Sequence, residues 1–338
     1  MVGTIVASII MFGLLIFVHE FGHFIVARLT GIRVLEFAIG FGKELIGWEK
    51  GGTKYTLRLF PLGGFCKMLG EDQEDAAVEG SFQEKPVLHR LAVIAAGSIM
   101  NFVLAAILFA LLYFFFLGVP QTGMSQIGQV VEDGPAYHAG VQDGDTVVSI
   151  NGVETTKWND VVSIINAHPG QEIQLLLLRN DSYVETSVVP KDEGGRGLIG
   201  IAPASKKYAF FSSIYLGFTY TWFLIQLIFV SLFQMITGSI PADVAGPVGI
   251  AAVVGEVMQE GISNLMSLAA IISVNLGIIN LLPIPALDGS RIVFLILEGI
   301  RGKPVDPQKE GFIHFVGFTL LILLMIFVAF QDISRIVF

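Results

Sequence analysis

The sequence holds little charge and a single cysteine, and both shortages narrow what the chain can be. Only 14% of its 338 residues are charged whereas 53% are hydrophobic, a balance typical of an integral membrane protein. The net charge of -9 argues against nucleic acid as a partner. With Cys66 alone, the chain can form neither an internal disulfide framework nor a cysteine-based zinc site. Any bound metal would therefore need histidine and carboxylate ligands.

The apolar start of the chain also lacks the features of a cleaved signal peptide. Residues 1–18 have neither a basic beginning nor a small-residue cleavage pattern. Cleavage there would remove the polar motif that follows at residues 19–23, or separate it from its membrane helix. We therefore expect a retained first membrane span over about residues 2–27.

That polar motif is His19-Glu20-Phe21-Gly22-His23, an H-E-x-x-H pattern. Residues four apart share one face of a helix, so His19 and His23 can present two imidazoles to one metal ion. Glu20 is placed beside them to accept a proton from water, as in zinc peptidases. Ionisable groups in a membrane helix are costly and usually functional, which favours a metal site over a polar helix end at the interface.

Residues 32–70 alternate like short strands separated by glycine-rich turns. We expect strands at residues 34–39, 45–49, 55–60 and 65–69. Such a sheet can dip into a membrane only if protein covers its backbone groups. Its open edge could then pair with an extended substrate. A plain hairpin outside the membrane is the alternative.

A second span is expected over about residues 91–117, and it contains Asn101. An amide in hydrocarbon needs a hydrogen-bonding partner, so Asn101 either joins helices or belongs to the site. The two interpretations stay open at this point.

Residues 121–205 change character, becoming polar with short β-like segments. We expect strands near residues 126–131, 146–150, 173–178 and 184–189, and one amphipathic helix over 157–167. The segments Gly134–Gly140, Asp143–Asp145 and Ile150–Gly152 resemble a bacterial, circularly permuted PDZ domain. By that resemblance, a peptide end would be received by a loop formed by Leu198, Ile199, Gly200 and Ile201. Such a domain binds a peptide by strand addition, or it serves as a steric gate.

The last third of the chain, residues 206–338, is again apolar. We expect a membrane-associated segment at about 210–237, a third span at about 264–298 and a fourth at about 312–330. Prolines interrupt the third span and free backbone groups, which suits a polar-lined site. Asp288 in that stretch is the carboxylate that the H-E-x-x-H lacks as a third metal ligand. The alternative is an interfacial N-cap for a helix beginning at Gly289.

Lysine and arginine indicate the orientation in the membrane. They are dense between the first two spans and before the last, so these segments are expected on the cytoplasmic side. The N-terminus and the PDZ domain are then outside, and the H-E-x-x-H is near the cytoplasmic face. For Asp288 to reach that depth, residues 210–237 must stay on the outer side. The expected architecture is a polytopic α-helical membrane protein with four spans, a small membrane-associated β-sheet and one extracytoplasmic PDZ domain of α+β type.

Together these features resemble the site-2 protease family of intramembrane zinc peptidases, in particular the bacterial regulator-of-sigma-E branch. Further matching segments are Arg58–Glu71, Gly97–Asn101, Gly246–Ile250 and Asn280–Gly289. The resemblance implies zinc on His19, His23 and Asp288, with Glu20 as catalytic base. It also implies a re-entrant sheet and a substrate backbone held by residues that include Asn101, Asn280, Gly63 and Gly64.

By the same resemblance, the chain is a multi-pass protein of the bacterial inner membrane. Its partners would be the lipid bilayer and single-span membrane proteins, such as trimmed anti-sigma factors or signal-peptide remnants. Two features depart from the family: only one PDZ domain fits, and Ser98 stands where proline is frequent. The competing hypotheses are a metal transporter or sensor that uses the same His and Asp, and a PDZ scaffold with a membrane anchor.

Overall fold

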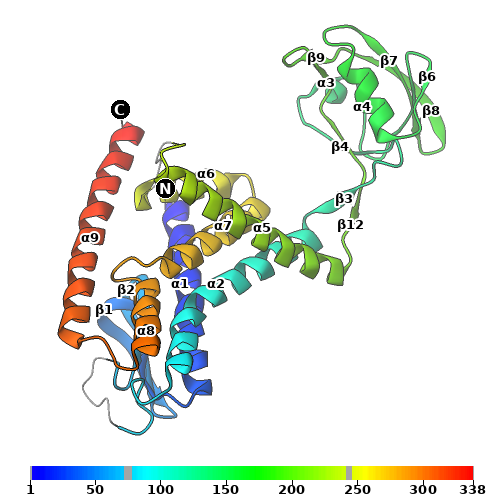
Figure 1. The fold of residues 1–338 in the computed structure, drawn as a ribbon. Coiled ribbons are helices and arrows are strands. Elements are labelled where there is room, and N and C mark those ends of the chain that lie inside the picture. Colours follow the sequence, from blue (N-terminus) through cyan, green and yellow to red (C-terminus); the bar gives the residue numbers. More distant parts are fainter. Residues whose placement is uncertain (1, 72–77, 241–245, 338) are drawn as a thin grey trace. The chain divides into compact units, whose positions relative to one another are not determined.

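The computed structural model describes residues 2–71, 78–240 and 246–337, and the chain forms two compact units (Figure 1). The first unit comprises Met1–Leu112 with Phe211–Phe338, and the second comprises Tyr113–Phe210. The polar region at the centre of the sequence therefore forms a unit of its own, and the apolar segments on either side of it come together.

The apolar segments form helices. Their bounds are α1 Val2–Leu29, α2 Val87–Phe115, α5 Phe210–Ile236, α6 Pro247–Gln259, α7 Ile262–Leu281, α8 Asp288–Arg301 and α9 Pro307–Val337. Among the described residues, five of these helices are long and apolar enough to cross a membrane: α1, α2, α5, α7 and α9. The chain is thus a membrane protein with several apolar helices, as its composition predicts.

Helices α1, α2 and α7 pack closely because small residues lie where they meet. A Cβ at Gly22 of α1 would overlap the backbone of Ala96 in α2. A Cβ at Gly277 of α7 would lie 2.6 Å from the ring of Phe102 in α2. Small residues let helix backbones approach in this way in membranes. Ser273 of α7 also donates a hydrogen bond of 2.7 Å to the Asn101 carbonyl.

The sheet in the first unit is built from two long, bent strands, β1 (Val34–Lys50) and β2 (Thr53–Met68). The four expected strands lie mostly within them, and the positive φ of Gly40 (89°) marks a bend. Residues 36–39 have partners on both sides, 64–67 and 54–57, so they lie inside the sheet. This arrangement leaves residues 64–67 near one edge.

One expected element needs correction, because residues 264–298 are not one continuous span. Helix α7 ends at Leu281, and α8 begins only at Asp288. Pro283 and Pro285 provide no backbone N–H, and Ala286 has a φ of +74°, so the helix cannot run through. Helix α8 is a separate, amphipathic helix that begins with the expected third ligand.

The second unit is a small α/β unit with strands near the expected places. Its elements are β3 Gly118–Pro120, β4 Ile127–Val130, α3 Pro135–His138, β5 Thr146–Ile150, β6 Val153–Glu154, α4 Trp158–Asn166, β7 Ile173–Arg179, β8 Ser182–Val188, β9 Lys191–Asp192, β10 Gly197–Leu198, β11 Ile201–Pro203 and β12 Ser205–Lys207. A four-stranded sheet of order β6-β5-β7-β8 provides much of the core. Ile127, Val161 and Leu177 are fully buried there.

Candidate metal centre

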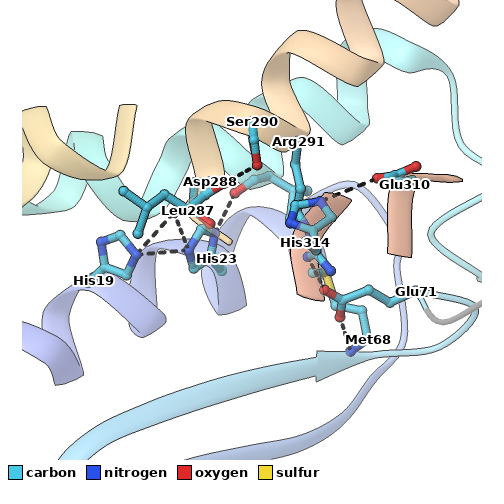
Figure 2. Close-up of polar contacts among 11 residues, drawn as sticks. His19, His23, Met68, Glu71, Leu287, Asp288, Ser290, Arg291, Glu310 and His314 are labelled. Carbon is cyan, nitrogen blue, oxygen red and sulfur yellow. Dashed lines mark hydrogen bonds and ion pairs between the residues drawn. The ribbon is translucent and has the colours of Figure 1, made fainter. Parts of the chain in front are cut away.

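Three side chains converge where α1, α2 and the start of α8 meet (Figure 2). Nε2 of His19 lies 3.1 Å from Oδ2 of Asp288, and Nε2 of His23 lies 3.4 Å from the same oxygen. The two Nε2 atoms are 3.3 Å apart. Both imidazoles are buried. Within the described ranges, this is the group of at least three His, Cys, Asp or Glu ligand atoms that is arranged to hold a metal ion.

The protonation of His23 shows why this cluster suits a cation. Its Nδ1 donates a hydrogen bond of 2.8 Å to the Val93 carbonyl, which fixes the proton on Nδ1 in the neutral ring. Nε2 therefore turns a lone pair toward Oδ2 of Asp288, which is buried and has no hydrogen-bond partner among the described residues. Lone pairs that face one another in a buried place are costly unless a positive charge lies between them.

The spacing fits zinc in particular. Zinc binds histidine nitrogen and carboxylate oxygen at about 2.0–2.2 Å in tetrahedral geometry, which separates the ligand atoms by about 3.3 Å. The three distances among His19, His23 and Asp288 are 3.1, 3.3 and 3.4 Å. Two imidazoles and one carboxylate also make up a ligand set known from catalytic zinc sites, with one position open.

Helix α2 supports both imidazoles from behind. A Cβ at Gly97 would overlap the ring of His23 and approach that of His19, so the absence of a side chain makes room for both rings. The amide nitrogen of Asn101 lies 3.3 Å from Nδ1 of His19. The amide of Asn101 thus lies beside His19, whereas the hydrogen bond that joins α2 to α7 is made by the backbone carbonyl of Asn101 and not by its amide.

Glu20 faces the sheet side of the same cluster. A Cβ at Gly64 would lie 3.2 Å from Cγ of Glu20, so this part of β2 approaches the expected catalytic base. Gly63, beside it, has a φ of 136° and packs against the Phe41 ring. The chain therefore brings Glu20, the two histidines, Asp288, Asn101 and Gly64 together.

The remaining expected binding residues lie on α7 and in the second unit. Asn280 is half-buried in the last turn of α7. In the second unit, Leu198 is exposed whereas Ile199 is buried in the core. Gly200 has a φ of +78°, and its carbonyl accepts a hydrogen bond from the Val131 amide.

Sequence reasoning missed three polar residues that flank Asp288 (Figure 2). Arg291, one turn further along α8, forms an ion pair with Glu71 just after β2. His314 of α9 accepts a hydrogen bond from the Ala286 amide, two residues before Asp288. A cavity of about 420 Å³ is lined by residues that include Asp288, Arg291 and His314. Arg291 has a signal in the sequence, its i+3 spacing from Asp288, and Glu71 ends the segment Arg58–Glu71 that resembles the family. His314 has neither signal.

Comparison with known proteins gives a consistent result. Residues 7–324 match peptidase family M50. In an alignment 421 residues long, the chain is 35% identical to the regulator of sigma-W protease RasP of Bacillus subtilis, with 99% of each chain covered. It is 35% identical over 416 residues to the zinc metalloprotease RasP of Bacillus licheniformis, covering 98% of this chain and 99% of the relative. A solved PDZ domain from Listeria monocytogenes shares 20% identity over 23% of this chain and 85% of its own, with a TM-score of 0.22.

Proposed function

Because the chain belongs to peptidase family M50, the site-2 proteases, and is a zinc metalloprotease, we propose that His19, His23 and Asp288 hold its zinc ion and that Glu20 is the general base. The observation that carries this assignment is the convergence of two imidazole nitrogens and one carboxylate oxygen within 3.1–3.4 Å of one another. The family and the names of the relatives also favour hydrolysis over the alternative of metal transport.

The reaction is hydrolysis of a peptide bond. When bound, zinc acts as a Lewis acid that polarises the scissile carbonyl and makes water more acidic. Glu20 accepts the proton of the attacking water and passes it to the leaving amine. The Val93 carbonyl holds the His23 ring in one tautomer, and Asn101 does the same for His19 if its amide oxygen faces Nδ1. Gly97 leaves room for both rings.

The proposed substrate is the transmembrane segment of a single-span membrane protein. A helix hides its amides in its own hydrogen bonds, so the segment must unwind before its backbone can be cut. The edge of β2 near Gly63 and Gly64 can pair with the extended form by strand addition. The approach of Gly64 to Glu20 supports this role, because a strand paired there would pass the general base. Asn101 and Asn280 are proposed to hold its polar backbone groups.

We propose four spans, α1, α2, α7 and α9, with α5 on the outer side. Helix α6 packs against the start of α1, where a Cβ at Gly255 would lie 2.8 Å from Thr4. It also packs near the end of α9, through Asp332. Helix α5 begins against the second half of α2, where Gly217 meets Ala106. The first part of α5 therefore packs on the second half of α2, and α6, the next described helix, packs on the start of α1. These contacts support the placement of α5 on the side where α1 begins and α2 ends.

The distribution of lysine and arginine supports a cytoplasmic location for the sheet of β1 and β2 and an outer location for the second unit. We propose that residues 121–205, within the second unit, form a PDZ domain that excludes substrates with large outer domains. Trimmed anti-sigma factors and signal-peptide remnants would then be accepted. The name of the Bacillus subtilis relative, a regulator of sigma-W protease, supports the first of these classes.

The test is zinc content together with cleavage of a single-span substrate by the full chain in detergent. Wild type should hold about one zinc ion and cleave. Glu20→Gln should hold zinc without cleaving, and Asp288→Asn should lose both zinc and activity. Cleavage by Glu20→Gln would overturn the role of the base. Full zinc content in Asp288→Asn would place the third ligand elsewhere.

A further inference from the structure

The loop that leads into Asp288 is fastened to α9 by one side chain. The backbone N–H of Ala286 donates a hydrogen bond of 3.1 Å to Nδ1 of His314. The amides of Leu282, Ile284 and Leu287 instead bond within the loop or to the end of α7. The hydrogen bond of Ala286 therefore ties the loop to a helix 28 residues away in sequence.

Ala286 needs such a tie because its backbone is strained. Its φ of +74° lies in the left-handed region, which residues with a Cβ rarely occupy unless the surroundings hold them there. Strain of this kind tends to persist at functional sites, where the surrounding structure determines the backbone. Ala286 is two residues before the carboxylate that completes the metal cluster, so relaxation of its backbone would move Asp288.

The His314 ring is itself held firmly. Helix α9 lies directly on the loop, because a Cβ at Gly317, one turn after His314, would overlap Pro285. The ring of Phe294 in α8 meets the imidazole edge-on, with centroids 5.8 Å apart. His314 is thus packed between the loop and the helix that carries Asp288 (Figure 2).

The hydrogen bond also defines the tautomer of His314. Because Nδ1 accepts from Ala286, the proton of the neutral ring lies on Nε2. Nε2 is buried and points toward Glu310 one turn earlier, whose carboxylate lies 3.8 Å away. The acidic neighbour favours a proton on Nε2 and leaves the Nδ1 lone pair to the loop.

We propose that His314 is a positioning residue for the metal centre: its Nδ1 holds the strained Ala286 so that Asp288 stays at coordinating distance from His19 and His23. This inference rests on the proposed role of Asp288 as the third zinc ligand. It assigns α9 a part in the active site although α9 contributes no ligand. Groups that orient ligands from behind typically change metal affinity by about 10–100-fold when they are removed.

The experiment measures zinc retention by the full chain against a graded chelator, alongside kcat and KM for a single-span substrate. His314→Asn places an amide oxygen close to the position of Nδ1, whereas His314→Gln places its amide nearer to Nε2. His314→Leu removes the acceptor. Thr319→Ala is the matched control, because Thr319 is exposed on the same helix and bonds only its own turn. Thermal stability of the zinc-free chain is recorded for each variant.

We expect His314→Leu and His314→Gln to release zinc at chelator concentrations about tenfold lower than wild type, with reduced kcat. His314→Asn and Thr319→Ala should stay near wild type. If His314→Leu fails to fold, the contrast between Asn and Gln still decides. Equal retention in all variants, or equal loss in Asn and Gln, would overturn the proposal.

Asp288→Asn, measured in parallel, distinguishes a wrong ligand set from a wrong role of His314. If it retains zinc like wild type, the proposed ligand set is wrong. If Asp288→Asn loses zinc while the His314→Leu and His314→Gln variants hold it normally, only the role of His314 is wrong.

Discussion

Glu71 and Arg291 form an ion pair that connects the end of the sheet to the helix carrying the third ligand. One oxygen of Glu71 pairs with the Arg291 guanidinium, and the other accepts a hydrogen bond of 3.2 Å from the Met68 amide at the end of β2. Arg291 lies one turn after Asp288 on α8. One carboxylate therefore connects the end of β2 to the helix that carries Asp288.

Breaking this pair should impair cleavage more than zinc binding. Glu71→Gln and Arg291→Gln each leave a partly buried charge unpaired, which costs about 1–3 kcal/mol. We expect kcat/KM for a single-span substrate to fall in both single variants. The charge exchange of Glu71→Arg with Arg291→Glu should recover part of the loss, because the pair itself is restored. Additive losses with no recovery would contradict the coupling.

We expect that Gly97 cannot be replaced by a larger residue, because the rings of His19 and His23 lie where its side chain would be. Gly97→Ala adds a Cβ that overlaps the His23 imidazole, and overpacking of this kind costs about 1–3 kcal/mol. We expect reduced zinc content and reduced cleavage. Gly13→Ala is the matched control, because Gly13 of α1 has open space where the Cβ would lie. Normal zinc content in Gly97→Ala would show that α2 can move away, contrary to the close packing described above.

The sequence predicts local features of the site well because they depend on periodicity. A four-residue spacing on one helix suffices to place His19 and His23 on one face. The prolines before Asp288 indicate a broken helix, although not that α7 and α8 are separate. Glu71 and Arg291, 220 residues apart, leave no local pattern. His314 is likewise one isolated histidine in an apolar run, and only the packing of α9 on the loop gives it a partner.

The second unit should lose stability at low pH through Asp145. Burial raises the pKa of this carboxyl, but hydrogen bonds from Arg179 and the Gln142 amide outweigh that effect and lower the pKa below its usual value. The folded unit therefore binds fewer protons than the unfolded one. The stabilisation is present above about pH 4, the usual range for Asp, and is lost as the pH falls through the folded pKa.

Amide exchange of β5 and β7 in the full chain, corrected for intrinsic rates, measures this effect. We expect Asp145→Asn to exchange faster than wild type at pH 7, and the difference to shrink below about pH 4 as Asp145 becomes protonated. Asp181→Asn, in the exposed turn between β7 and β8, should match wild type throughout. A difference that stays constant with pH would show that the charge of Asp145 is not the cause.

Asp332 near the end of α9 should stabilise the start of α6. Its Oδ2 accepts a hydrogen bond of 2.8 Å from the Gly249 amide, and its Oδ1 accepts one of 3.2 Å from Gly246. These amides belong to the helix terminus, where backbone donors lack partners within the helix and a negative charge is favoured. A Cβ at Gly246 would lie 2.6 Å from the carboxylate, so the glycines allow the approach.

Asp332→Asn replaces one acceptor by a donor that faces another donor, which should cost about 1 kcal/mol, as for a lost helix cap. We expect amide exchange over residues 246–259 to rise about fivefold. Asp306→Asn is the matched control, because Asp306 caps the other end of α9 by accepting from Gln308. It should leave α6 unchanged. Unaltered exchange in Asp332→Asn would mean that the packing of α6 against α1 and α7 holds it in place, and that the carboxylate has no part in joining α6 to α9.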